Sequence, residues 1–292
     1  MSPKSIEVAC WNVAKGLGLP PVESNIYEGI KSFDADFIFL SEGYATGDGD
    51  SKYCKLPQDE IDGRIHDFAA AEGYNVAITN YDDTDKARSD VPSNFEQYAV
   101  LLTRPRFNMN VTQVRLGTRN AFRALVELQG ASPMPIYGAH FDDRTTEARE
   151  GMAQAFLEGV ANIAHQENKP IDGLPATLAG DLSVMHSKSI SARLTGSSLF
   201  SAAAEHAPVK RVKSLGTRLH EMANGNLLNR LEKAGFSDAH PLRQPTFRFA
   251  GLPLVQLDHI MTRGVYAVNP KRLKQKGSDH DALTVTIYPI AQ

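Results

Sequence analysis

Six short polar clusters stand out in this sequence because most of them follow directly after an apolar run. They are Trp11-Asn12, Ser41-Glu42-Gly43, Gly138-Ala139-His140-Phe141-Asp142, Gly180-Asp181-Leu182-Ser183, Leu257-Asp258-His259 and Ser278-Asp279-His280. The apolar runs before the first five have the length and composition of strands. A sheet with Asn, Glu, Asp and His at its strand ends builds one acidic, histidine-bearing pocket. Such a pocket suits a hard divalent cation and a phosphate ester.

Four acids in these clusters are candidates for one site: Glu42, Asp181, Asp258 and Asp279. Two unit charges about 4 Å apart repel by roughly 4 kcal/mol at an effective dielectric near 20. The cluster therefore needs a cation or histidines to offset its charge. Carboxylate and amide oxygens favour Mg²⁺, Mn²⁺ or Ca²⁺ over zinc, so we expect Glu42 and Asn12 to be metal ligands. Taken singly, either residue has an alternative role, as a loop cap or a solvated carboxylate.

The histidines divide into one with an acidic partner and others without a pattern. Asp258 and His280 suit a pair in which the carboxylate orients the imidazole, and His280 then stabilises phosphate or exchanges a proton. His259 points to the opposite face of the same strand, so we expect a structural role for it. The sequence has no Gly-x-Ser-x-Gly elbow, Walker loop or Cys-x-x-Cys pair. Serine acyl transfer, nucleotide cradling and structural zinc therefore have no support.

The composition is that of a globular protein with little overall charge. Of 292 residues, 42% are hydrophobic, and 31 Lys plus Arg stand against 34 Asp plus Glu, a net charge of −3. Net charge therefore gives no attraction to nucleic acid or membranes. Cys10 and Cys54 predict no disulfide framework, and without a signal segment before the first strand we expect a cytoplasmic protein. Because the clusters extend from Asn12 to His280, we expect one domain over 1–292.

Apolar periodicity predicts the elements that position these clusters. We expect strands at 6–11, 35–40, 74–79, 98–103, 110–116, 122–128, 136–140, 176–179, 254–262 and 283–288. We expect helices at 22–33, 59–71, 145–165 and 219–234, the last ending before Gly235. Helices and strands alternate early and late in the chain, with a meander of strands between. This α/β order favours two packed sheets flanked by helices over a simple parallel fold.

With these residues identified, the chain resembles the endonuclease/exonuclease/phosphatase superfamily, whose fold is called DNase I-like. The resemblance covers nearly the full length and keeps the order of the superfamily's motifs. The matching segments are Trp11-Asn12, Ser41-Glu42, 138–142, Gly180-Asp181, 257–260 and 278–280. It implies a four-layer α/β sandwich of two packed mixed sheets and a hydrolase that cleaves phosphate esters.

The resemblance also implies a metal site and one departure from the superfamily's pattern. By position, Glu42 and Asn12 would hold Mg²⁺ or Mn²⁺, and Asp279 would help to bind the metal. Ser183 stands where the superfamily usually has Asn. A hydroxyl is shorter than a carboxamide and offers one donor instead of two. We therefore expect residue 183 to contact the substrate phosphate differently from the superfamily's Asn. The metal ligands and the residue that positions the attacking water would be unaffected.

The catalytic roles follow from the same correspondence. His140 would contact the phosphate or assist the leaving group. Asp181 would position the attacking water, and Asp258 would orient His280.

Basic residues near the last cluster bear on the substrate. They are Lys271, Arg272, Lys274 and Lys276, with Arg263 a strand end away. In a chain of net charge −3 such a group suits a polyanion, so we expect these residues, with Asn12 and Ser183, to contact a nucleic-acid substrate. The alternative is a solvated basic loop. No amphipathic helix or apolar loop suited to a bilayer is evident, and no obligate protein partner is implied.

The sequence therefore predicts a Mg²⁺-dependent phosphodiesterase, a nuclease. One alternative is a phosphatase or phosphodiesterase for a small or lipid phosphoester, of the inositol phosphate or sphingomyelin type. A second is a binding protein that has lost catalysis, which Ser183 favours and the other filled positions disfavour.

Overall fold

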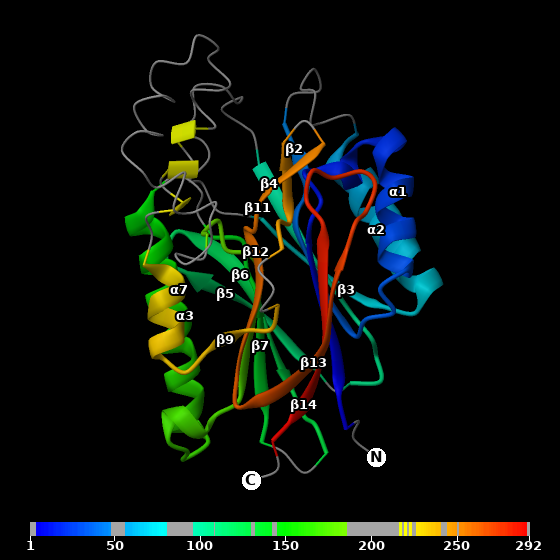
Figure 1. Cartoon of the computed structure of the whole chain (residues 1–292). Coiled ribbons are helices and arrows are strands. Elements are labelled where there is room, and N and C mark those ends of the chain that lie inside the picture. The colour runs from blue at the N-terminus through cyan, green and yellow to red at the C-terminus, as the bar shows by residue number, and fades with distance from the viewer. Residues whose placement is uncertain are drawn as a thin grey trace.

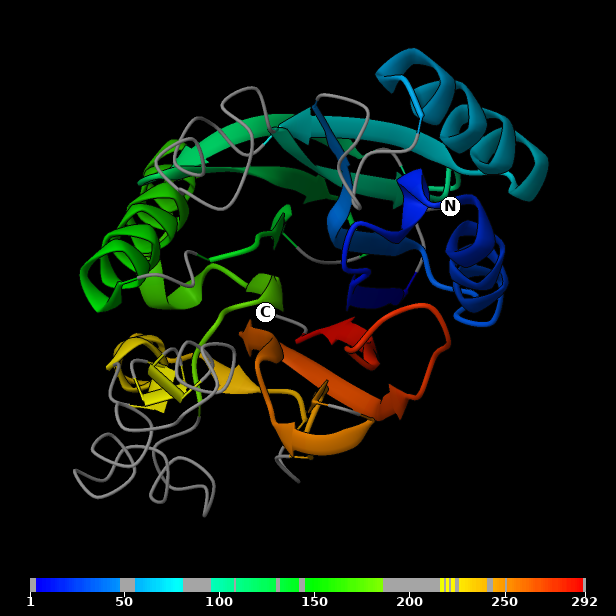
Figure 2. The ribbon, with the colours of Figure 1, turned by 90° about the horizontal axis from the view of Figure 1, so that it is seen from above.

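Two six-stranded mixed β-sheets face each other, with helices on both outer sides (Figure 1). The computed structural model describes residues 4–47, 56–80, 96–107, 109–129, 132–141, 145–185, 216–217, 219–220, 222–223, 226–240, 244–249 and 251–290. Within these residues the chain forms the two sheets, a separate two-stranded sheet, and helices α1 (Pro20–Lys31), α2 (Gln58–Glu72), α3 (Thr146–Gln166) and α7 (Leu227–Lys233). Figures 1 and 2 show α1 and α2 on one side of the molecule and α3 and α7 on the other. The four-layer sandwich predicted from the sequence is confirmed.

The first sheet contains both ends of the described chain. Its strands, in order across the sheet, are β13 (Val265–Leu273), β14 (Ala282–Pro289), β1 (Ile6–Asn12), β2 (Phe37–Thr46), β4 (Glu96–Thr103) and β3 (Asn75–Asn80). β1 is parallel to β2 and antiparallel to β14. This arrangement places the end of β1 beside the loop that precedes β14.

The second sheet is built from the middle of the chain and one later strand. Its order is β5 (Asn110–Leu116), β6 (Arg119–Val126), β7 (Met134–Gly138), β8 (Ala176–Asp181), β12 (Asp258–Arg263) and β9 (Ser237–Asp238). β7 and β8 are parallel, whereas β12 is antiparallel to β8. A short hairpin of β10 (Phe247–Phe249) and β11 (Leu252–Val255) precedes β12.

Apolar side chains alternate between two cores along the central strands. In β1, Val8 and Cys10 lie in the core between the sheets, whereas Ala9 and Trp11 lie in the core beneath α1 and α2. Full burial of a large apolar side chain such as Phe39 contributes about 1.5–3 kcal/mol. The central strands are buried on both faces, which explains their nearly continuous apolar sequence.

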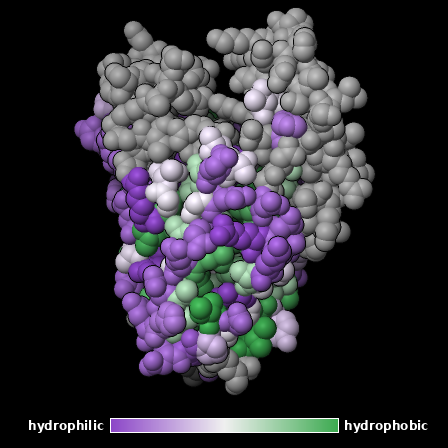
Figure 3. Space-filling model, turned by 90° about the vertical axis from the view of Figure 1, so that its left-hand side faces the viewer, coloured by the Kyte–Doolittle hydropathy of each residue, from purple (hydrophilic) through white to green (hydrophobic). Residues whose placement is uncertain are grey.

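Two further helices cover the second sheet. Met152 and Phe156 of α3 and Leu231 of α7 pack in one cluster against Leu178 and Met261 of the sheet. Among the described residues on the side that carries these helices, hydrophilic residues surround several hydrophobic areas (Figure 3). No helix in the described part of the chain is long and apolar enough to cross a membrane.

The predicted strand at 254–262 is wrong in one respect, because the structure divides it into β11 and β12. The hydroxyl of Thr246 accepts hydrogen bonds from the backbone N–H groups of Leu257 and Asp258, at 3.0 and 3.1 Å. These donors therefore bond a side chain instead of a neighbouring strand. The break makes Asp258 the first residue of β12.

Other predicted elements also differ from the structure, among them β2, which extends to Thr46 where the predicted strand ended at residue 40. The predicted helix at 219–234 appears as α7, of seven residues, with further helical residues at 216–217, 219–220 and 222–223. β13 was not predicted, because its exposed edge position leaves Val265–Leu273 without a clear apolar alternation. Cys54 lies outside the described residues, and Cys10 is buried as a free thiol.

Candidate active site

Strand pairing in the first sheet places Asn12 next to Glu42. Asn12 ends β1 and is the parallel partner of Ser41 in β2. The register of β2 against β4 then shifts between Leu40 and Tyr44, and Glu42 lies in this irregularity with a positive φ of 48°. A bulge turns a side chain away from the regular alternation of a strand. The irregularity therefore sets where the Glu42 carboxylate lies.

Strand pairing in the second sheet brings Asp181 and Asp258 together. Asp181 is the last residue of β8, Asp258 is the first of β12, and the two are direct antiparallel partners. Gly180 permits this geometry, because a Cβ atom there would lie 1.9 Å from the carbonyl oxygen of Ala139 and its φ is +145°. Both carboxylates are buried.

The end of β1 also holds the loop before β14, which carries His280 into the site. Trp11 donates from Nε1 to the carbonyl of His280 at 3.0 Å, and the Ser278 hydroxyl donates to the carbonyl of Asn12 at 2.6 Å. The N–H of His280 donates back to the Ser278 hydroxyl at 3.0 Å. The ring of Phe247, in β10, lies 5.1 Å from the imidazole of His280. His280 is thus fixed on several sides.

Asn12 connects carboxylates that belong to different sheets. Its Nδ2 donates to Asp181 Oδ2 at 2.9 Å and lies 3.3 Å from Glu42 Oε1. Its Oδ1 accepts from the N–H of Ala14 at 3.0 Å. The amide therefore presents its NH₂ group to the carboxylates, and it must turn over to offer its oxygen to a metal.

Two histidines complete what we call the polar cluster: Asn12, Glu42, His140, Asp181, Asp258 and His280. His140 Nε2 lies 3.8 Å from Asp181 Oδ2 and 4.0 Å from Glu42 Oε1. His280 Nε2 lies 4.0 Å from Asp181 Oδ2, and its Nδ1 lies 2.7 Å from Asp258 Oδ2. The structure thus brings together six residues that the sequence placed on separate segments. Their chemical roles stay predictions.

The cluster raises the pKa values of Asp181 and His280, for different reasons. Burial raises the pKa of Asp181, and the nearby charge of Asp258 raises it further. Burial lowers the pKa of His280, but the charges of Asp258 and Asp181 outweigh this effect and raise it to about 10. His280 is therefore a cation at neutral pH. Buried groups whose pKa values are shifted by specific charged neighbours are typical of sites that move protons.

Lys15 belongs to this site, although the sequence analysis did not single it out. Its ammonium group pairs with Glu42 Oε2, on which Gln97 Nε2 also lies at 3.4 Å. Burial raises the pKa of Glu42, but the charges of Lys15 and His140 outweigh burial and hold it well below its usual range. A lysine three residues after Asn12 has no partner nearby in the sequence, so no local signal identified it.

Backbone strain is concentrated around the cluster. Ala14, Lys15, Glu42 and Ser183 all have φ between 48° and 68°, a region that non-glycine residues seldom occupy. Such residues cost about 1–3 kcal/mol each and persist where the surrounding structure over-determines them. Their grouping at one place is consistent with a functional site.

Ser183 contacts Asp181 and is buried. Its N–H and its hydroxyl both donate to Asp181 Oδ1, at 2.8 and 3.3 Å. The hydroxyl therefore orients a carboxylate in the structure, whereas the sequence placed it on the substrate. Asp142, the last residue of its predicted cluster, lies outside the described residues.

The structure separates Arg263 from the polar cluster, contrary to the expected substrate contact. It lies at the opposite end of β12 from Asp258, about 16 Å away at 3.3 Å per residue. Its guanidinium donates to the carbonyls of Leu174 and Ala234 and stacks over Phe236. The buried side chain therefore joins β12 to its neighbours.

Asp279 and the basic residues lie at the end of β13 and in the loop that leads to His280. Asp279 is exposed, and among the described residues the tight acidic and histidine group comprises Asp181, Asp258 and His280 without it. The four basic residues of this segment are also exposed: Lys271, Arg272, Lys274 and Lys276. Arg272 also donates to the carbonyl of Pro245 at 2.7 Å and lies 3.7 Å from the carboxylate of Asp281.

A second Asp–His pair, Asp238 and His259, lies beside the polar cluster on β9 and β12. His259 Nδ1 lies 2.8 Å from Asp238 Oδ2, and its Nε2 lies 3.0 Å from the carbonyl of Val184. Both ring nitrogens are therefore used within the protein, in agreement with the structural role predicted for His259. The pair ties β9 and β12 to the segment that follows Asp181.

The polar cluster has ligand atoms that fit a hard divalent cation. Glu42 Oε1 and Asp181 Oδ2 both contact the same Asn12 amide group. Asp181, Asp258 and His280 each offer one ligand atom within 4.8 Å of the others. Among the described residues, Asp258 Oδ1 is buried without a hydrogen-bond partner. Because oxygen donors predominate, Mg²⁺ or Mn²⁺ suits the site better than zinc.

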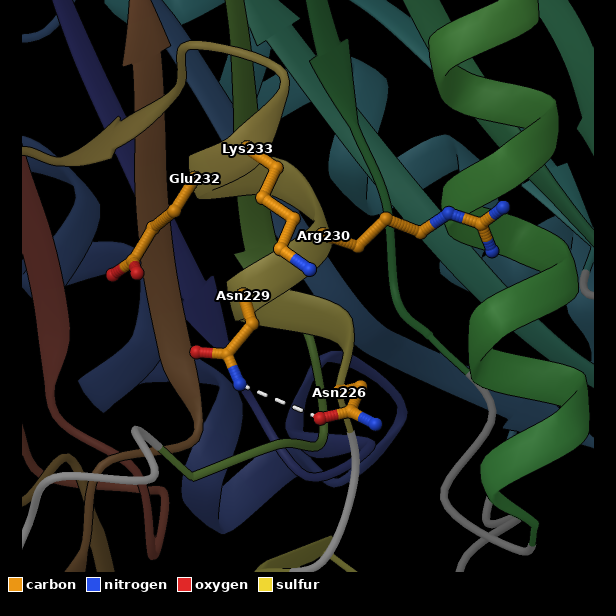
Figure 4. A pocket seen from close by; sticks show the side chains of 5 residues that line it. All are labelled: Asn226, Asn229, Arg230, Glu232 and Lys233. Carbon is orange, nitrogen blue, oxygen red and sulfur yellow. Dashed lines mark hydrogen bonds between the residues drawn. The ribbon is translucent and has the colours of Figure 1, made fainter.

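A hollow elsewhere on the surface has no comparable chemistry. It has a volume of about 530 Å³ and is lined by Asn226, Asn229, Arg230, Glu232 and Lys233 (Figure 4). These side chains come from α7 and the residue before it, and Asn229 Nδ2 donates to Asn226 Oδ1 at 3.4 Å. The hollow is therefore one exposed helix face on the second sheet's outer side.

Solved structures share this fold over nearly the whole chain. The human Nocturnin catalytic domain matches with a TM-score of 0.61 at 16% identity, covering 98% of this chain and 96% of that one. An endonuclease/exonuclease/phosphatase protein from Beutenbergia cavernae matches with a TM-score of 0.59 at 14% identity, covering 98% and 72%. A mannosyl-6-phosphatase from Bacteroides thetaiotaomicron matches with a TM-score of 0.57 at 15% identity, covering 97% and 99%.

These matches confirm the DNase I-like fold that the motifs predicted. No family model and no curated protein matches the sequence itself. At 13–16% identity the solved structures establish the architecture, and the chemistry must be argued from the site.

Proposed function

We propose that this protein is a divalent-metal-dependent phosphoesterase whose substrate is a phosphodiester of nucleic acid. The observation that carries the proposal is the polar cluster itself. Carboxylates from both sheets converge on Asn12, with Asp181 Oδ2 at 2.9 Å and Glu42 Oε1 at 3.3 Å, and two histidines lie within 4.0 Å of Asp181. The DNase I-like fold adds support, since the neighbours that share it include a mannosyl-6-phosphatase.

Glu42 is the principal metal ligand in this proposal, with Asn12 beside it. Glu42 is partly accessible, with 20% of its side chain exposed, whereas Asp181 is almost fully buried. His280 is less suited to a metal, because the Asp258 charge favours its protonated form. A metal bound here would polarise the phosphoryl oxygen and favour attack by water.

The remaining members act on the water and the phosphate. Asp181 orients the attacking water, and its raised pKa favours acceptance of a proton. Asp258 fixes the ring of His280 at 2.7 Å, so that the imidazolium Nε2 faces the reacting group. His140, on the Glu42 side of Asp181, assists the leaving group.

Nucleic acid is favoured as substrate by the exposed basic residues at the end of β13 and in the loop after it. Lys271, Lys274 and Lys276 are exposed near the loop that carries His280, in a chain of net charge −3. Clustered lysines bind a phosphate backbone through local charge even where overall charge is negative.

A small phosphoester is the second candidate. Arg272 is partly neutralised by Asp281, which weakens the basic group, and a sugar phosphatase shares the fold.

A binding protein without catalysis is the third candidate. The observation in its favour is the ion pair of Lys15 with Glu42.

The test is a panel of hydrolysis assays with purified protein in EDTA and after addition of Mg²⁺ or Mn²⁺. The panel contains plasmid DNA, single-stranded DNA, RNA, bis-p-nitrophenyl phosphate and inositol phosphates. We expect metal-dependent cleavage of the diesters. Cleavage of inositol phosphates alone would favour the second candidate, and no cleavage with either metal would favour the third.

A further inference from the structure

The carboxylate of Glu42 is already engaged on both of its oxygens. Oε1 faces Asn12 Nδ2 at 3.3 Å and His140 Nε2 at 4.0 Å. Oε2 receives the ammonium group of Lys15 and lies 3.4 Å from Gln97 Nε2. Of these donors, Lys15 brings an ammonium group on a flexible four-carbon stem. Any cation that binds Oε2 therefore meets this ammonium group first.

The backbone directs Lys15 into this position. The N–H of Val13 donates to the carbonyl of Ser41 at 3.0 Å, and the N–H of Lys15 donates to the carbonyl of Glu42 itself at 2.6 Å. Ala14 and Lys15 both have positive φ, 49° and 68°. Two consecutive residues in this region are costly, and here the hydrogen bonds to β2 hold them. The Lys15 side chain is 15% exposed, so its contact with Glu42 is more than a chance surface pairing.

An ammonium group and a divalent cation compete for the same carboxylate. They repel each other, and a metal needs an oxygen lone pair that the Lys15 hydrogen bond now uses. We propose that Lys15 is a tethered competitor of the divalent cation at Glu42, which weakens metal binding until the ion displaces it. The inference rests on the proposed function in one respect, that Glu42 is a metal ligand.

Metal binding measured without substrate tests this inference. Mn²⁺ is titrated into the parent protein and its variants, and the free ion is followed by electron paramagnetic resonance. Lys15→Met and Lys15→Gly remove the charge, Lys15→Arg keeps it, and Lys31→Met is the matched control. Lys31 pairs with Glu28 and Glu72 at 3.2 and 3.4 Å on the exposed face of α1, away from the cluster.

We expect Lys15→Met and Lys15→Gly to bind Mn²⁺ about fivefold more tightly than the parent, the factor expected for loss of one competing ion pair. Lys15→Arg and Lys31→Met should stay within about twofold of the parent, a change too small to reflect loss of that pair. Thermal unfolding confirms that each variant is folded. The glycine variant relieves the positive φ, so it keeps the test valid if the methionine variant unfolds.

Three results would overturn the inference: unchanged Mn²⁺ affinity without the Lys15 charge, weaker affinity without it, or no Mn²⁺ binding by any form. Failure of the proposed function has a different signature. Tighter Mn²⁺ binding in Lys15→Met, together with no hydrolysis of any phosphoester by the parent, would retain the competitor role and reject the esterase.

Discussion

At the scale of single residues, the Asp181 carboxylate is held in place by several hydrogen bonds. It accepts hydrogen bonds from Asn12 Nδ2 and from the N–H and hydroxyl of Ser183. A carboxylate held by three donors has a fixed orientation, which is what a group that positions water requires. The same contacts give Ser183 a supporting role, because its hydroxyl reaches Asp181.

We therefore expect unequal effects of substitution at these two positions. Asp181→Asn should lower kcat at least about a hundredfold, since general-base assistance typically contributes 10²–10⁴. Ser183→Ala should lower it less than about tenfold, or about 1.4 kcal/mol, because the N–H of residue 183 still donates to Oδ1. Steady-state kinetics on both variants, with circular dichroism as a check of folding, decide the matter. Equal losses would make Ser183 a primary catalytic group.

Glu42 is the residue whose replacement should change the response to metal. Glu42→Gln keeps the shape and removes the charge, so the Mg²⁺ concentration for half-maximal activity should rise at least about tenfold. EDTA should abolish activity in the parent. Glu60→Gln is the control, since Glu60 pairs with Arg64 at 2.7 Å on the exposed face of α2. Full activity of the parent in EDTA would contradict the metal site.

At the scale of elements, the close approach of β7 and β8 sets the position of Asp181. Gly180 allows it, since a Cβ there would lie 1.9 Å from the carbonyl oxygen of Ala139, whereas a Cβ at Gly138 would lie 2.5 Å from Phe39 of β2 in the facing sheet. The contact at Gly180 involves backbone, which cannot move without separating the strands. Gly180 is thus required for strand packing and is also part of the Gly180-Asp181 motif.

Gly180→Ala should destabilise the protein by at least about 2 kcal/mol, through the clash and the positive φ together. Gly151→Ala is the matched control, because a Cβ there meets nothing within 4 Å on α3. Alanine in a helix interior should stabilise by about 0.5–1 kcal/mol relative to glycine. Urea denaturation of the two variants measures both changes. A Gly180→Ala protein as stable as the parent would show that the strands are less tightly packed.

At the scale of the whole molecule, charge is distributed unevenly. The chain carries −3 overall, yet four exposed basic residues lie in or after β13, close to the loop that holds His280. Arg248 also forms an ion pair with Asp281 at 3.1 Å, as Arg272 does at 3.7 Å. A locally basic edge beside an acidic cluster is suited to a phosphate chain whose scissile group enters the cluster.

If nucleic acid is the substrate, its binding should weaken with salt at a log–log slope of about −0.9 per phosphate neutralised on a duplex. Replacing Lys271, Arg272, Lys274 and Lys276 by Ser should flatten this slope. Arg230→Ser with Lys233→Ser, on the exposed face of α7, should leave it unchanged. Fluorescence anisotropy with labelled duplex over a salt series measures the slopes. An unchanged slope in the quadruple variant would move the small-phosphoester candidate ahead.

The sequence by itself determined most of the elements and the six residues of the polar cluster. Apolar periodicity extends over a few residues and reports directly which face of a strand is buried, so β1, β5 and α3 were predicted to within a residue or two. The motif order identified the six members of the polar cluster, because four of them follow or precede a predicted strand and His140 and Asp258 lie within one.

Only the tertiary structure decided contacts between segments far apart in the chain. The Thr246 hydroxyl that divides β11 from β12, the bulge that sets Glu42 and the far end of β12 that holds Arg263 all depend on which strands pair and in which register. Lys15 meets Glu42 across 27 positions of sequence. No local pattern encodes such a pairing, because its energy comes from partners that come together when the sheets form.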